Sequence, residues 1–90
     1  MLQLVTSGRF KRDVKRAAKR GKDINKLGQV IDLLLSAEPL PARLKDHPLK
    51  GAWKDWRDLH IEPDWLLIYR VAENRLELAA TGTHADLFDA

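Results

Sequence analysis

The spacing of apolar residues changes along this chain of 90 residues, and each spacing predicts a different element. Residues 2–6 follow a two-residue alternation, which predicts a short first strand buried in a sheet. Apolar positions then recur every three to four residues over 8–20 and 24–37, which predicts two amphipathic helices. Ser7 and Asp23 are suitable N-caps for these helices. The first half is therefore expected to form a strand and two helices joined by a short turn.

Prolines end the helical pattern, and residues 39–54 are expected to form a long loop. The spacing then returns to two. Turn sequences, Pro-Asp and Glu-Asn, divide this part into three predicted strands over 56–62, 65–71 and 75–79. The middle strand is mostly apolar, which is typical of a strand buried on both faces. A threonine then caps a predicted helical turn over 84–88.

The predicted order is β-α-α-β-β-β with a short C-terminal helical turn, in a single domain over residues 1–90. The fold class is α+β, with two N-terminal helices packed on one face of a small, mainly antiparallel β-sheet. The other face is left free as a concave working surface. Strict alternation groups Asp58, His60 and Glu62 on one face of their strand. It also places residue 80 on the face of the leucines in the last strand.

Charge is distributed unevenly. The formal net charge is +3, yet residues 1–26 carry nine basic residues against two acidic ones, a local charge of +7, so the remainder carries −4. Such a segment is expected to meet a polyanion or an acidic protein, and a solvated helix face is the plainer interpretation. The absence of cysteine excludes disulfides and fits a reducing cytosol. No apolar run approaches the roughly 18 residues that span a bilayer. We therefore expect a cytoplasmic protein with no membrane partner.

Three histidines supply the candidate chemistry. His47, His60 and His84 each lie beside polar or turn-forming residues. Imidazole has the unperturbed pKa nearest to neutral pH and is the usual proton carrier in catalysis. Two or three imidazoles with an aspartate provide the base and the acid for cleaving RNA through its own 2′-OH, and an arginine normally stabilises the charge. Solvent-exposed or structural histidines are the equally weighted alternative.

A metal site is a competing use of the three histidines and Asp64, because His and carboxylate sets can hold zinc. No closely spaced His pair supports it, so we expect no metal and no cofactor. Trp53, Trp56 and Tyr69 are expected in the core, as aromatic residues of a short sheet usually are. Trp65 follows a turn at the start of a strand and is a candidate for stacking on a base.

Several long strings in the right order carry a family resemblance. They are Phe10-Lys11-Arg12-Asp13, residues 19–23, residues 45–54, residues 56–69 and Thr81-Gly82-Thr83-His84 with the four residues after it. On these strings, which cover nearly the whole chain, the protein resembles the YafQ-type toxins of the RelE superfamily, the mRNA interferases of bacterial type II toxin–antitoxin systems.

The resemblance implies a RelE-like fold and a defined activity. Such a toxin enters the ribosomal A site and cuts mRNA there as a metal-independent endoribonuclease, leaving a 2′,3′-cyclic phosphate or a 3′-phosphate. Its implied partners are the 70S ribosome with its mRNA and a cognate antitoxin protein. Operator DNA is an implied partner only through the antitoxin complex.

The resemblance also implies site residues. His84 is assigned as the general acid, His60 or Asp64 as the base, and His47 as a group that orients the phosphate or shares the proton transfers. Trp65 and Phe88 are assigned to hold the mRNA bases. The basic residues expected to contact RNA are Lys11, Lys15, Lys19, Lys50, Lys54 and Arg57.

One departure from the family pattern matters. The family usually has an arginine immediately before Thr-Gly-Thr-His, and this chain has Ala80 there. Losing one contact to the developing charge often costs about 10²–10³ in rate, so reduced activity is expected. An engineered change is the favoured explanation. A naturally weak or inactive member, or replacement by Arg57, Lys50 or Lys54, are the others.

Two further functions remain open. A non-catalytic module that binds RNA or the ribosome through the basic segment predicts salt-sensitive ribosome binding without cleavage. A regulatory module that only pairs with an antitoxin predicts tight binding to an acidic partner and no affinity for ribosomes.

Overall fold

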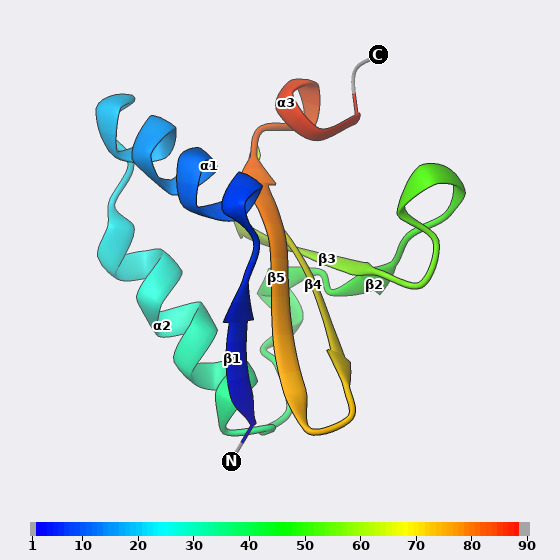
Figure 1. The fold of residues 1–90 in the computed structure, drawn as a ribbon. Helices are drawn as coiled ribbons and strands as arrows, with labels where there is room; N and C mark the ends of the chain where they lie inside the picture. The colour runs from blue at the N-terminus through cyan, green and yellow to red at the C-terminus, as the bar shows by residue number, and fades with distance from the viewer. Residues whose placement is uncertain (1, 89–90) are drawn as a thin grey trace.

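A five-stranded sheet forms the centre of the protein, and α1 and α2 lie on one side of it (Figure 1). The structure is a computed structural model that describes residues 2–88. Its elements are β1 (Gln3–Thr6), α1 (Gly8–Lys19), α2 (Ile24–Leu35), the 3-10 helix η1 (Ala42–Leu44), β2 (His47–Pro48), the 3-10 helix η2 (Gly51–Trp53), β3 (Arg57–Glu62), β4 (Trp65–Ala72), β5 (Arg75–Gly82) and α3 (His84–Phe88).

The strands lie in the order β1-β5-β4-β3-β2. β1 pairs with β5 in parallel, and the other three pairs are antiparallel. The predicted α+β class and its order of elements are confirmed. The segment 39–54, predicted as a loop, also contributes the two-residue strand β2 to the edge of the sheet.

Capping residues set the ends of the two long helices. The Ser7 side chain accepts a hydrogen bond from the Phe10 amide at 2.9 Å and begins α1. Gly21 has φ +84° and ends this helix, because a left-handed residue there lets the next amides bond back to the last carbonyls. α2 begins after Asp23 and ends at Leu35, two residues before the predicted boundary.

β1 is an edge strand, which corrects the prediction that it is buried. It pairs only with β5, and three of its four residues are exposed. Leu4 is 44% exposed and Val5 38% exposed. The alternation of side chains was read correctly as a strand, but alternation carries no information on where a strand lies in the sheet.

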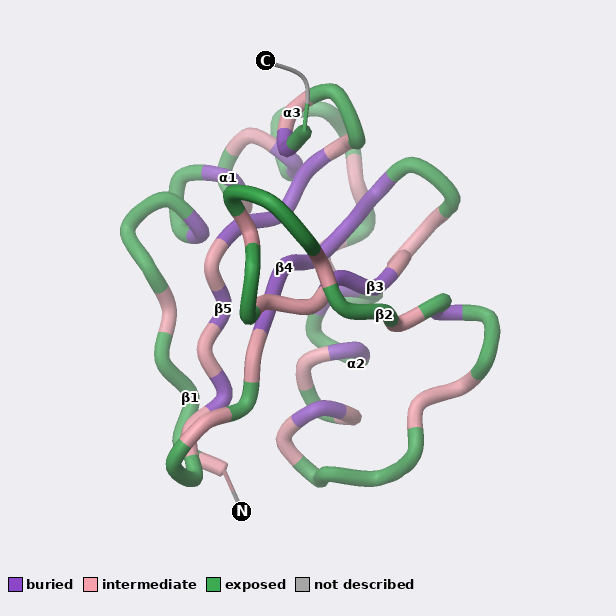
Figure 2. Tube along the Cα trace, turned by 90° about the vertical axis from the view of Figure 1, so that its right-hand side faces the viewer, coloured by how far each residue is buried: buried purple, intermediate pink, exposed green. Residues whose placement is uncertain are grey.

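β4 separates two apolar clusters (Figure 2). Trp65, Leu67 and Tyr69 belong to the cluster that also contains the buried residues of α1 and α2. The alternate residues Leu66 and Ile68 belong to a second cluster on the opposite face, because side chains alternate along a strand. Side chains from the loop after β2 and from α3 cover this second cluster, namely Leu49, Trp53, Trp56 and Leu87. The prediction that this face is free was wrong over that area.

A bulge in β5 reverses the expected orientation of residue 80. Tyr69 pairs with Leu78, and the preceding residue Ile68 pairs with Ala80, so Ala79 is an extra residue in the ladder. Leu78 therefore lies in the helix-side cluster and Ala80 in the opposite one. Strict alternation had placed residue 80 with the leucines, and that prediction was wrong.

A second irregularity, between His60 and Glu62, ends the alternation of β3. Glu62 is opposite Trp65, and its carboxylate pairs with Lys22 Nζ at 3.1 Å and Lys26 Nζ at 2.9 Å. The prediction that Glu62 shares a working face with His60 is corrected, because Glu62 instead joins β3 to the start of α2.

Candidate active site

Three histidines meet where β2, β3 and the start of α3 come together. The ring centre of His60, in β3, lies 6.4 Å from that of His47 and 5.5 Å from that of His84. The exposed ring of Phe88 follows at 6.4 Å from His84. Residues up to 41 positions apart in sequence thus form one continuous row of rings.

His84 is held by Asp64, which lies in the turn between β3 and β4. The carboxylate oxygen Oδ1 of Asp64 accepts the His84 backbone amide at 2.9 Å and lies 2.5 Å from Nδ1 of its ring. Because an ionised carboxylate only accepts, Nδ1 carries a proton and Nε2 is left free. These hydrogen bonds, from the backbone amide first and the ring second, lower the pKa of Asp64.

His47 lies between two acceptors. Its Nδ1 is 2.9 Å from the carbonyl oxygen of Lys45 and therefore carries a proton. Its Nε2 is 3.0 Å from Oδ1 of Asp58, although this oxygen has no aligned hydrogen-bond donor within residues 2–88. Two acceptors facing one imidazole favour a shared proton between Nε2 and the carboxylate.

Asp58 is the site residue that sequence reasoning did not select. It belongs to β3, is 2% exposed and lies on the same face as His60, two residues away. Burial raises the pKa of its carboxyl, and the charges of His47, His60 and His84 oppose that rise. Its two-residue spacing from His60 within one strand was the signal available in the sequence.

The environment of His60 favours its neutral form. Burial lowers the pKa of His60 first, and the neighbouring His84, Lys45 and His47 add to that effect, while Asp58 opposes it. A neutral imidazole is a proton acceptor at neutral pH. The site thus places a proton acceptor at His60 next to His84, whose Nε2 is free to exchange a proton.

Ala80 lies under this site, fully buried. It is 0% exposed and packs with Leu66, Ile68 and Leu87. The bulge turns residue 80 toward the face that carries Asp58 and His60, since Asp58 pairs with Ile68 and Ile68 pairs with Ala80. A longer side chain at this position would therefore start on the face of the histidines.

Trp65 is in the core instead of on the surface. It is 1% exposed, and its indole N–H donates to Thr81 Oγ1 at 3.0 Å. Lys22 Nζ lies 5.8 Å from the ring centre. No face of this indole is open to a base in the structure, whereas Phe88 is 42% exposed.

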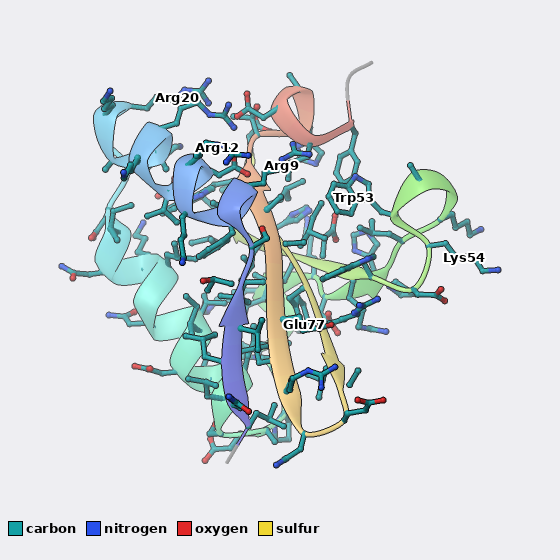
Figure 3. All side chains as sticks on the ribbon, viewed as in Figure 1. Arg9, Arg12, Arg20, Trp53, Lys54 and Glu77 are labelled. Atoms are coloured by element: carbon teal, nitrogen blue, oxygen red, sulfur yellow. The ribbon has the colours of Figure 1, made fainter. Side chains whose placement is uncertain are left out.

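The cations assigned to RNA differ in their freedom. Arg57 is engaged by a two-pronged hydrogen bond to Asp46, at 3.1 Å and 2.8 Å, and Tyr69 also bonds that carboxylate. Lys50 and Lys54 lie exposed around η2, and Figure 3 shows Lys54 pointing into solvent. Along α1, Arg9 and Arg20 contact acidic residues or α3 (Figure 3). Within residues 2–88, the exposed side chains on this helix without an acidic partner are Lys11, Arg12, Lys15 and Lys19.

Metal and membrane roles were examined on the same coordinates. Over the part of the chain that the structure describes, no three His, Cys, Asp or Glu side chains are arranged to hold a metal ion. No helix between residues 2 and 88 has the length and apolar character needed to cross a bilayer.

Comparisons with known proteins agree with this geometry. The family described as "Bacterial toxin of type II toxin-antitoxin system, YafQ" matches residues 2–89. The mRNA interferase toxin YafQ of Escherichia coli strain K12 is 54% identical over 83 residues, which cover 91% of this chain and 90% of the relative. The crystal structure of YafQ from E. coli strain BL21(DE3) superposes with a TM-score of 0.93 at 49% identity, covering 98% of this chain and 99% of that one.

A third relative is the toxin in the crystal structure of the E. coli DinJ–YafQ complex. It superposes with a TM-score of 0.90 at 50% identity and covers 98% of this chain and 99% of that one. Sequence, fold and the row of histidines thus lead to one conclusion: this chain belongs to the YafQ family of bacterial type II toxin–antitoxin toxins.

Proposed function

We propose that this toxin is a ribosome-dependent endoribonuclease that cuts mRNA in the A site, through metal-independent acid–base attack of the ribose 2′-OH. The row formed by His47, His60 and His84 is the observation that carries the proposal. The mRNA interferase named among the relatives supports the reaction class.

The side chains divide the reaction between them. Neutral His60 takes the proton from the 2′-OH, and the oxygen then attacks the adjacent phosphorus. His84, oriented by Asp64 through Nδ1, presents Nε2–H and protonates the departing 5′-oxygen. His47, backed by Asp58, faces the phosphate, and Phe88 provides an exposed face for a base.

We further infer that Ala80 lowers the rate of this form. An alanine in an apolar cluster offers no charge to the phosphorane. Arg57, one of the cations considered as a replacement, is held by Asp46. Lys50 and Lys54 are exposed and remain candidates to replace it.

Basic side chains on α1 explain how the toxin reaches its substrate. Lys11, Lys15 and Lys19 recur every four residues, so they project from neighbouring turns of one helix face. We propose that this face docks on ribosomal RNA in the cytoplasm and that a cognate antitoxin neutralises the toxin. The toxin of the DinJ–YafQ complex supports a protein partner of that kind. Operator DNA is reached only through the antitoxin complex.

The proposal is tested with purified 70S ribosomes carrying a defined mRNA. The Ala80→Arg variant is expected to cut the mRNA in the A site, in the presence of EDTA and only when ribosomes are present. The products should carry a 2′,3′-cyclic phosphate or a 3′-phosphate. His84→Ala in the same background is the matched control and should leave the mRNA intact. An Ala80→Arg protein that is folded and binds ribosomes without cutting would refute the catalytic proposal.

Ala80 also favours a second candidate, a module that binds RNA, the ribosome or an antitoxin without catalysis. This candidate predicts that the unaltered chain binds ribosomes with an affinity that falls steeply with salt, or binds only an acidic protein. Binding measured from low to high salt, with a Lys11, Lys15 and Lys19 triple glutamine variant as control, separates the ribosomal from the antitoxin-only form.

A further inference from the structure

α3 carries His84, yet a helix of five residues has almost no stability of its own. Its internal support is a reciprocal cap. The amide of Thr83 donates to Asp86 Oδ2 at 3.0 Å, and the amide of Asp86 donates to Thr83 Oγ1 at 3.1 Å. Leu87, 7% exposed, fixes the far end in the apolar cluster. Neither contact determines how the first turn is oriented toward the sheet.

Guanidinium groups of α1 reach α3 at the same carboxylate. Arg20 Nη1 donates to Asp86 Oδ2 at 2.7 Å and Nη2 lies 3.4 Å from Oδ1, a forked contact between side chains 66 positions apart. Arg16 Nη2 is 3.9 Å from the same Oδ2, and Arg9 donates to the Asp86 carbonyl at 3.4 Å. Asp86 is therefore the point at which α3 is attached to α1.

Two neighbouring features make this attachment specific. The buried carboxylate of Asp13, 5% exposed, accepts the backbone amide of Thr81 at 3.1 Å and also pairs with Arg16 at 3.0 Å, so α1 holds the end of β5 as well. Gly82 leaves room for the Asp86 carboxylate, since a Cβ there would stand 2.8 Å from Asp86 Oδ2. The segment leading to His84 is thus held on one side by α1, and Asp64 holds the imidazole on the other.

We propose that Arg20 and Asp86 are positioning residues, whose ion pair fixes α3 against α1 and so sets the place of the His84 ring relative to His60. Only the kinetic part of this inference rests on the proposed endoribonuclease function; the structural part does not. Catalysis depends steeply on such placement, because a shift of about 1 Å away from the productive geometry can cost about 10²-fold in rate.

Amide exchange of the whole chain, followed by NMR, tests the structural part. In Arg20→Gln, protection of the α3 amides should fall about three- to tenfold and the ring proton signals of His84 should shift. Asp86→Asn keeps an oxygen for the Thr83 amide but loses the charge, and it should behave likewise. Arg20→Lys should recover part of the protection. Arg12→Gln removes the same charge from an exposed position on α1 and is the matched control.

Cleavage kinetics on ribosomes test the catalytic part. Arg20→Gln is expected to lower kcat about tenfold with KM for ribosomes unchanged, since the ring is misplaced but docking is intact. Raised KM with unchanged α3 protection would mean that Arg20 binds RNA, and the inference would be overturned. Unchanged exchange and unchanged His84 signals would overturn it too. If no form of the toxin cuts RNA, the proposed function fails, and the exchange data still decide whether the ion pair holds α3.

Discussion

The carboxylate of Asp64 receives two hydrogen bonds from one residue, His84, one from its backbone amide and one from its ring. The first fixes the start of α3 next to the turn between β3 and β4. The second fixes the tautomer of the ring and leaves Nε2 for the substrate. One exposed carboxylate thus sets both the position and the protonation of the proposed acid.

Removing this carboxylate should impair catalysis more than folding. Asp64→Ala, measured in the Ala80→Arg background, is expected to lower the cleavage rate on the order of 10²-fold. Its free energy of unfolding should change little, because Asp64 is exposed. Glu73→Ala, at a carboxylate 79% exposed in the hairpin turn, is the control and should keep the rate of the Ala80→Arg parent. Equal rates in the two variants would contradict the role of Asp64.

Restoring a cation at residue 80 should raise activity at the expense of stability. Ala80→Arg is expected to increase the cleavage rate about 10²–10³-fold. The same change forces a long chain into an apolar cluster that is 0% exposed at Ala80, so the midpoint of urea unfolding should fall. Ala80→Met has similar length without charge. It should be destabilised in the same way and gain no activity, and a comparable gain in the Met variant would exclude the electrostatic explanation.

The pH dependence of cleavage should report His60. Because its pKa is lowered, the neutral form persists to lower pH than in a free imidazole, and the acid limb of the rate profile should have its midpoint below about 6.5. Asp58 raises the pKa of His60, so Asp58→Asn should move this midpoint lower still. Single-turnover rates from pH 5 to 8 would show it, and a midpoint above that of free imidazole would contradict the role of His60 as base.

Asp58 should also make stability depend on pH. Its carboxyl has a raised pKa in the folded state, so its stabilising contribution is complete below the ordinary aspartate value of about 3.9 and is lost as pH rises through the folded pKa. Relative to Asp58→Asn, the unaltered toxin should therefore lose unfolding free energy as pH increases from about 4 upward. Parallel urea titrations of both proteins measure this difference, and a difference independent of pH would count against a buried titrating carboxyl.

Trp65 should behave as a core residue. Trp65→Phe removes the hydrogen bond to Thr81 Oγ1 and leaves unfilled volume, which should lower the free energy of unfolding by about 1–3 kcal/mol. Ribosome affinity, corrected for the folded fraction, should not change. Phe88→Ala is the comparison, because that ring is 42% exposed: it should keep stability and weaken cleavage. Loss of RNA binding in a stable Trp65→Phe protein would return the indole to the site.

Predictions from sequence succeeded where local pattern determines structure and failed where pairing between strands does. Ser7, Asp23 and Gly21 act at helix ends as their side chains or backbone allow, and Thr83 caps α3. The orientations of Glu62 and Ala80 were predicted wrongly, because each follows an irregularity in a strand ladder. A bulge depends on the partner strand and leaves no signature in the alternation that precedes it.

The histidines show the same division. Residue types and motifs identified His47, His60, Asp64 and His84 as candidates, since few side chains carry protons near neutral pH. Their assembly into one row, the unaligned oxygen of Asp58 behind it and the attachment of Asp86 to Arg20 depend on residues far apart in the chain.

The sequence by itself determined the helices, the strands, the turns and the uneven charge, because each of these follows from backbone preferences and side-chain chemistry within a few residues. Only the tertiary structure decided which strand lies at the edge, which face Ala80 occupies, that Trp65 is enclosed and which nitrogen of His84 is free. The reason is physical. Burial, hydrogen-bond partners and proton positions are set by neighbours in space, and the sheet brings those neighbours together from opposite ends of the chain.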